Sequence, residues 1–137
     1  MRITVDTNVL ISATFWNGAS NKIIELVERK EIELFLSQEI LQEYAQVLEY
    51  DEIKEKIKDK GLNTKYSLGK IISISKIVNP KENFEAVKDD SDDNMVINAA
   101  VEGKVEYIVS TDNHLLKLKD FKNIKIVAPH EFLEMFK

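Results

Sequence analysis

The chain has 137 residues, 44% of them hydrophobic and 31% charged, with a formal net charge of −5 and no cysteine. A chain of this size can bury roughly two thirds of the surface that it exposes when unfolded, so we expect a single domain over residues 1–137 that needs no disulfide or structural metal. The absence of cysteine excludes a thiol nucleophile and cysteine-ligated metal sites, and the negative charge by itself disfavours a polyanionic partner.

The sequence also contains no segment typical of membrane proteins. No stretch approaches the roughly 18 apolar residues that a membrane-spanning helix needs. Asp6 interrupts the N-terminal segment at the point where a secretory signal would have its apolar stretch. We therefore expect a cytoplasmic protein that does not interact with a membrane.

Strands and helices are predicted to alternate along the chain. In chain order we predict a strand over 2–5, helices over 9–16 and 23–30, a strand over 32–36, helices over 40–48, 51–60 and 63–75, a strand over 76–78, a helix that ends at Gly103, strands over 107–112 and 124–127, and a helix that begins at Pro129. Strands separated by helices indicate right-handed βαβ crossovers. The predicted fold class is therefore α/β, a three-layer α/β/α sandwich with a mainly parallel central sheet.

Two aspartates follow predicted strands. Asp6 comes directly after the first strand, and Asp112 comes after the strand whose apolar part is residues 107–109. In an open parallel sheet, ligands bind beyond the carboxyl ends of the strands, near the switch in strand order. If the two strands are neighbours, the two carboxylates converge at that edge.

Helical periodicity adds further carboxylates to this group. Asp93 stands 3, 4, 7 and 8 residues before apolar side chains of its helix, so it heads the buried face. Asp92 is rotated off that face, and we interpret it as a helix N-cap. Glu43 lies one turn from both Ile40 and Val47, at the edge of the apolar stripe of its own helix.

Four carboxylates at one edge of a sheet repel one another, and protonation of one of them relieves the repulsion only in part. A divalent cation relieves it further, and ligands that are all oxygen atoms suit Mg²⁺ or Mn²⁺. Such ions catalyse displacement at phosphorus. The predicted reaction is therefore phosphodiester hydrolysis, with these catalytic residues: Asp6, Glu43, Asp93 and Asp112.

Four segments in order resemble the motifs of the PIN-domain ribonucleases. They are residues 6–13 (DTNVLISA), Glu43-Tyr44 with Val47-Leu48, Asp92-Asp93-Asn94 at the start of a helix that runs to Ala100, and Ser110-Thr111-Asp112 followed by Leu115-Leu116. Within that family the sequence is most similar to the VapC-like toxins of bacterial and archaeal toxin–antitoxin pairs. The resemblance implies Mg²⁺- or Mn²⁺-dependent endonucleolytic cleavage of RNA, a homodimer, and a cognate antitoxin protein as partner.

The resemblance also implies roles for individual residues. It assigns Asp6, Glu43, Asp93 and Asp112 to the metal site, with Asp92 as an auxiliary ligand. It further implies that Asn8 and Thr111 orient the carboxylates, as residues around metal sites commonly do. His114 stands where many relatives have a further acid. This departure leaves both a one-metal and a two-metal site open.

Other interpretations remain open. Each acid taken singly could be a helix cap or a turn residue. The protein could also be a housekeeping RNA-processing nuclease, or a catalytically weak PIN-fold binding module. The acidic composition does not exclude RNA, because the five candidate acids carry five negative charges, as many as the whole net charge of −5. Bound metal would leave the remaining surface close to neutral.

Overall fold

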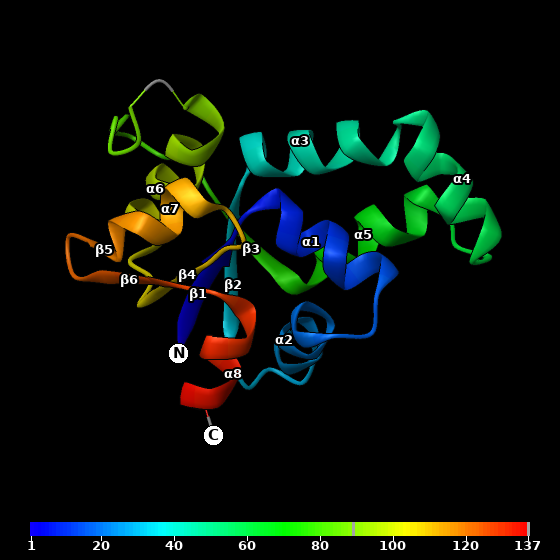
Figure 1. Ribbon diagram of the computed structural model, residues 1–137, viewed down its shortest axis with the longest axis horizontal. Coiled ribbons are helices and arrows are strands. Elements are labelled where there is room, and N and C mark those ends of the chain that lie inside the picture. The colour runs from blue at the N-terminus through cyan, green and yellow to red at the C-terminus, as the bar shows by residue number, and fades with distance from the viewer. Residues whose placement is uncertain (89, 137) are drawn as a thin grey trace.

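The computed structural model describes residues 1–88 and 90–136, so Asp89, within the acidic run of the sequence, lies outside the described residues (Figure 1). Within these ranges the strands are β1 Arg2–Val5, β2 Glu33–Ser37, β3 Ser75–Val78, β4 Tyr107–Val109, β5 Asp120–Phe121 and β6 Ile124–Val127. The helices are α1 Thr7–Phe15, α2 Ala19–Glu28, α3 Gln38–Leu48, α4 Asp51–Asp59, α5 Thr64–Ile74, α6 Ser91–Gly103, α7 Asn113–Leu118 and α8 Pro129–Phe136.

The strands form one sheet in the order β3-β2-β1-β4-β6-β5. Every neighbouring pair is parallel except β5 with β6, which is antiparallel. The strand order reverses between β1 and β4, which pair directly with Val5 beside Val109. The condition for convergence of Asp6 and Asp112 is therefore met, because the chain leaves both strands at the same edge of the sheet.

Helices cover both faces of this sheet. Figure 1 shows α6 and α7 on one face and α1, α2, α3 and α5 on the other, and α8 packs against α2. Crossovers from β1 to β2 and from β2 to β3 run in one direction along the sheet, whereas the crossover through α6 runs back to β4. Right-handed connections therefore place α6 on the opposite face from α1. The predicted α/β/α sandwich is confirmed.

Some predicted boundaries were wrong. Helix α1 begins at Thr7, two residues earlier than predicted, because the Asp6 carboxylate accepts a hydrogen bond from the Val9 N–H and so starts the helix. Strand β4 ends at Val109, three residues before its predicted end, and the chain then turns into α7. The sequence prediction missed β5, because a strand of two residues is too short to show an alternating pattern.

The core lies between the sheet and the two helical layers. Ile3, Leu34 and Ile108 on neighbouring strands are at most 1% exposed, and Ile97 on α6 is fully buried against the sheet. Because Ile97 follows Asp93 by four residues, burial of this face also directs Asp93 inward. In residues 1–88 and 90–136, no helix has the length and apolar character that crossing a membrane requires.

Ile97→Ala is expected to lower the free energy of unfolding by about 2–5 kcal/mol, because truncation leaves a cavity between α6 and the sheet. The matched control is Ile72→Ala on α5, where the side chain is 45% exposed and the expected loss is below about 1 kcal/mol. Urea denaturation followed by circular dichroism measures both. Equal losses in the two variants would contradict this packing.

Candidate metal centre

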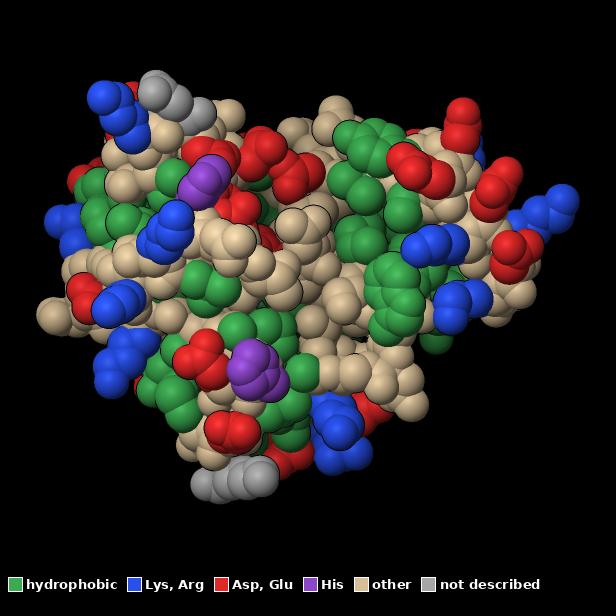
Figure 2. Space-filling view, viewed as in Figure 1, with side chains coloured by type: hydrophobic (Ala, Val, Ile, Leu, Met, Phe, Trp, Pro, Cys, Tyr) green, Lys and Arg blue, Asp and Glu red, His purple; other side chains and the backbone are tan. Residues whose placement is uncertain are grey.

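A cavity opens at the carboxyl ends of β1 and β4. The acids that line it are Asp6, Glu43, Asp90, Asp92, Asp93 and Asp112. Figure 2 shows acidic side chains gathered in the upper part of the visible face, beside a histidine. The structure thus places all five sequence-predicted acids around one cavity and adds Asp90, which the sequence analysis did not single out.

Asp6 joins the ends of the two central strands. Its Oδ1 accepts the Val9 N–H at 2.9 Å, and its Oδ2 accepts the Ser110 hydroxyl and, at 3.4 Å, the Thr111 N–H. Thr111 therefore reaches Asp6 through its backbone and not its side chain. The carboxyl group is buried, and burial raises the pKa of Asp6 above its ordinary value even though these hydrogen bonds lower it.

Asp112 is oriented by the helix that it caps. Its Oδ1 accepts the N–H groups of His114 and Leu115 at 2.8 and 3.2 Å, and its own N–H donates to Ser110 Oγ at 2.9 Å. Ser110 thus links Asp6 to the Asp112 backbone. The Asp112 carboxyl group also interacts with the Asp93 side chain, which starts from α6.

Asp90 caps α6, and the prediction that Asp92 is the N-cap was wrong. Asp90 Oδ1 accepts the Asp93 N–H at 3.1 Å, three residues along the chain, which is the geometry of an N-cap. Its second oxygen lies 3.4 Å from Nδ1 of His114. Asp92 lies instead in the first turn of the helix, exposed to solvent. The three-residue spacing between the cap and the next inward-facing residue could have identified Asp90 from sequence.

Asp93 is a buried acid whose pKa is strongly raised. It is 6% exposed, and among the described residues its Oδ2 atom has no hydrogen-bond partner. Burial, and then the neighbouring Asp112 and Asp90, raise the pKa of Asp93 to about 8. An orphaned, buried carboxylate oxygen surrounded by other carboxylates fits a cation ligand, because a bound cation would satisfy the oxygen and remove the repulsion.

Glu43 lies on the other side of the cavity, where α3 passes the start of α6. Its carboxyl group is half-buried next to Asp92. Burial, followed by the Asp92 and Asp6 charges, raises the pKa of Glu43. Asn8 also lines the cavity, although it is exposed.

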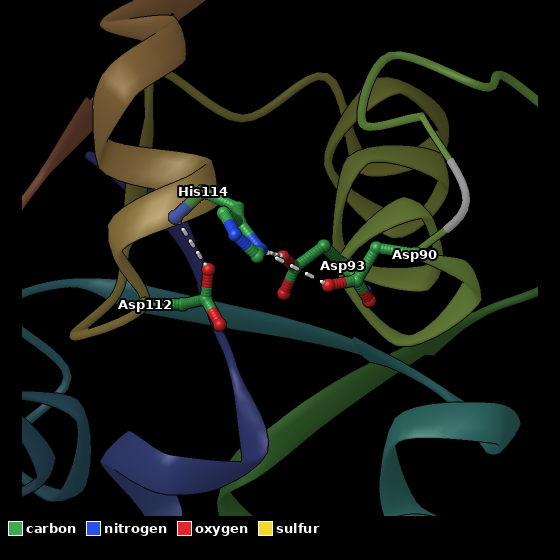
Figure 3. A group of neighbouring side chains, drawn as sticks. All are labelled: Asp90, Asp93, Asp112 and His114. Atoms are coloured by element: carbon green, nitrogen blue, oxygen red, sulfur yellow. Dashed lines mark hydrogen bonds and ion pairs between the residues drawn. The ribbon is translucent and has the colours of Figure 1, made fainter.

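The acids therefore divide into two groups. Asp6, Glu43 and Asp92 surround the α3 side of the cavity. On the α7 side, Figure 3 shows the side chains of Asp90, Asp93, Asp112 and His114 converging from the starts of two helices. One donor atom from each of these four lies within 4.8 Å of the other three.

Two comparisons with known proteins found matches, and one of them identifies the type of domain. A family model described as a PIN domain matches residues 2–114, a range that includes all the acids above. The chain is also similar to the uncharacterized protein MJ1680 of Methanocaldococcus jannaschii. The identity is 33% over 149 aligned positions, which cover 99% of this chain and 92% of that protein.

The raised pKa of Asp93 predicts that the protein loses stability as pH rises. In the folded state Asp93 keeps a proton that the unfolded chain releases near pH 4, so its contribution is complete below pH 4 and is lost as pH rises through about 8. Asp93→Asn removes this titration. In a chelator, we expect the variant to match the wild type near pH 4 and to exceed its unfolding free energy by on the order of 1–3 kcal/mol at pH 9.

Urea denaturation at a series of pH values measures this difference. Asp59→Asn on the exposed end of α4 is the control, because it removes the same charge away from the cavity. A pH profile of Asp93→Asn that coincides with that of the wild type would contradict the predicted titration of this carboxyl group.

Proposed function

The chain belongs to the PIN-domain family, and on this premise we propose that it is a metal-dependent endoribonuclease that hydrolyses RNA phosphodiester bonds. The observation that carries the proposal is the buried Asp93 oxygen, which has no hydrogen-bond partner in residues 1–88 and 90–136 and lies among carboxylates at the switch point of the sheet. The residues that would hold Mg²⁺ or Mn²⁺ are Asp6, Glu43, Asp93 and Asp112, with Asp92 as an auxiliary ligand.

These residues would contribute chiefly by fixed orientation. Asp6 is held by the start of α1 and by Ser110, and Asp112 is held by the first N–H groups of α7. Carboxylates oriented before binding lose little conformational entropy when a ligand arrives. A bound divalent ion supplies Lewis acidity, which neutralises charge on phosphate oxygens and lowers the pKa of a water molecule.

Asp93 would also make binding depend on pH. With its pKa raised to about 8, the carboxyl group holds its proton at pH 7 in the protein without a cation. A cation that binds the Asp93 oxygens must displace this proton. We therefore infer that metal affinity, and cleavage with it, rises between about pH 6 and pH 8.

We further propose that the protein is the toxin of a cytoplasmic toxin–antitoxin pair, a homodimer whose site is blocked by a cognate antitoxin. This proposal extends the sequence resemblance to the VapC-like group. A second candidate is a catalytically weak binding module, which is favoured by His114 at a position where many relatives have an acid. A housekeeping RNA-processing nuclease would use the same cavity.

Cleavage of mixed single-stranded RNAs tests the enzymatic proposal. The wild type is expected to cut internally with Mn²⁺ or Mg²⁺ and to lose activity in EDTA. Asp6→Asn is expected to lower the rate by about a hundredfold or more, because the lost charge acts where negative charge develops at phosphorus. Asn can keep the N-cap of α1, so the fold should survive, and a thermal melt checks this.

Asp59→Asn serves again as the charge-matched control and is expected to cleave as the wild type does. Equal rates for wild type and Asp6→Asn would refute the assignment of Asp6. Equal cleavage of single-stranded DNA would refute the restriction to RNA. Mn²⁺ binding without cleavage of any RNA would favour the binding module.

Regulated expression in a bacterial host tests the toxin role. The wild type is expected to stop growth, Asp6→Asn is expected to leave growth unchanged, and co-expression of a small neighbouring open reading frame that encodes an antitoxin is expected to restore growth. Growth curves and viable counts measure these effects. Normal growth with a protein that cleaves RNA in vitro would favour the housekeeping role.

A further inference from the structure

We propose that His114 and Asp90 complete, with Asp93 and Asp112, a mixed nitrogen and oxygen subsite that binds a first-row transition metal ion such as Mn²⁺ in preference to Mg²⁺. This inference rests on the proposed function and concerns the metal preference of the same cavity. His114 would then supply a ligand atom in place of the expected acid, and the metal site would be kept.

The separations between donor atoms fit a common ion. Nδ1 of His114 lies 3.4 Å from Asp90 Oδ2 and 4.0 Å from Asp93 Oδ2 (Figure 3). Two donors that each bind one ion at about 2.1 Å can lie up to about 4.2 Å apart. Both distances are within that range, so only small movements are needed to bring the four donors, all within 4.8 Å, around one ion.

The helix starts occupy only one oxygen of each capping aspartate. Asp90 and Asp112 each use Oδ1 for backbone N–H groups of the helix that they cap. Oδ2 of Asp90 contacts Nδ1 of His114, which is itself a proposed ligand. Asp93 contributes an oxygen that is buried and has no partner among the described residues. Asp6 differs, since both of its oxygens already accept hydrogen bonds. Asp93 therefore has more free ligand capacity than Asp6.

The donor set favours a transition metal. Imidazole nitrogen binds first-row transition metal ions well, whereas Mg²⁺ prefers oxygen ligands and retains its waters. The His114 side chain is 65% exposed, so a ring nitrogen can reach an ion without a desolvation cost. An ion pair between His114 and Asp90 alone would produce the same 3.4 Å contact, and the experiment must separate the two explanations.

The chain suits a nitrogen-specific measurement, because its only histidines are His114 and His130. The purified protein is titrated with MnCl₂ alone, and electron spin echo envelope modulation detects ¹⁴N coupled to the bound ion. We expect coupling from one imidazole in the wild type, its loss in His114→Asn, and its retention in His130→Asn, since His130 lies on α8 away from the cavity.

Affinities complete the test. His114→Asn is expected to raise the Kd for Mn²⁺ by about tenfold or more, with a smaller change for Mg²⁺. His114→Asp restores an oxygen ligand and is expected to reverse the preference toward Mg²⁺. Asp90→Asn keeps the Oδ1 acceptor and can still cap α6. Because it removes a charged ligand, it is expected to raise the Kd for Mn²⁺ by about tenfold.

The outcomes separate this inference from the enzymatic proposal. Mn²⁺ bound without ¹⁴N coupling would overturn the subsite and place the ion toward Asp6 and Glu43. An unchanged Kd for Mn²⁺ in His114→Asn would have the same meaning. Neither result would contradict RNA cleavage by the protein. No Mn²⁺ binding at all would overturn both proposals. Coupling that disappears in His114→Asn, in a protein that cleaves no RNA, would support the subsite and refute the nuclease.

Discussion

The parallel pairing of β1 with β4 is the constraint on which the candidate site depends. Because Val5 lies beside Val109, both strands end at the same edge, and the next residues, Asp6 and Ser110, are within hydrogen-bonding reach. Strand order reverses at this pair, so the crossovers on its two sides run along opposite faces of the sheet, and a cavity lies at this edge. The packing of α6 across the sheet then brings Asp93 to the same place. Sheet topology, rather than any local motif, assembles the acids.

The acids of the cavity have structural and functional roles at the same time. Asp6, Asp90 and Asp112 each cap a helix, so one oxygen of each carboxylate is held by backbone N–H groups. A cap fixes the direction of the side chain and stabilises the helix start, since a negative charge there is favourable. The second oxygens of Asp90 and Asp112 then face the cavity. For a single acid, a role as helix cap is an alternative to a role as metal ligand. For the three acids together, the two roles are compatible, because each cap orients a carboxylate toward the cavity.

Sequence patterns were sufficient to predict the fold and to identify five of the acids that line the cavity. They did not predict which of these acids lie next to one another. Asp93 could be placed because its spacing to buried residues is strictly helical, and Asp6 because it ends a clear strand. The grouping of Asp90 with His114 depends on how α6 and α7 approach each other, across 24 residues of chain. Helical periodicity indicates which face of a helix a residue occupies. It does not indicate which oxygen of a carboxylate already accepts a hydrogen bond. It therefore could not separate Asp6, whose two oxygens both accept hydrogen bonds, from Asp93, whose Oδ2 accepts none from the part of the chain that the structure describes.

The negative charge of the chain has a different meaning once the acids are located. Without a cation, the cavity relieves part of its repulsion by holding a proton on Asp93, whose pKa is raised to about 8. The whole chain therefore carries less negative charge at pH 7 than its formal net charge of −5, which counts Asp93 as ionised. A cation that displaces the proton would restore the carboxylate and cancel its charge in the same event. A phosphodiester would then meet a positive ion in a cavity that carries less net negative charge, so the acidic composition opposes RNA binding less once the cation is bound.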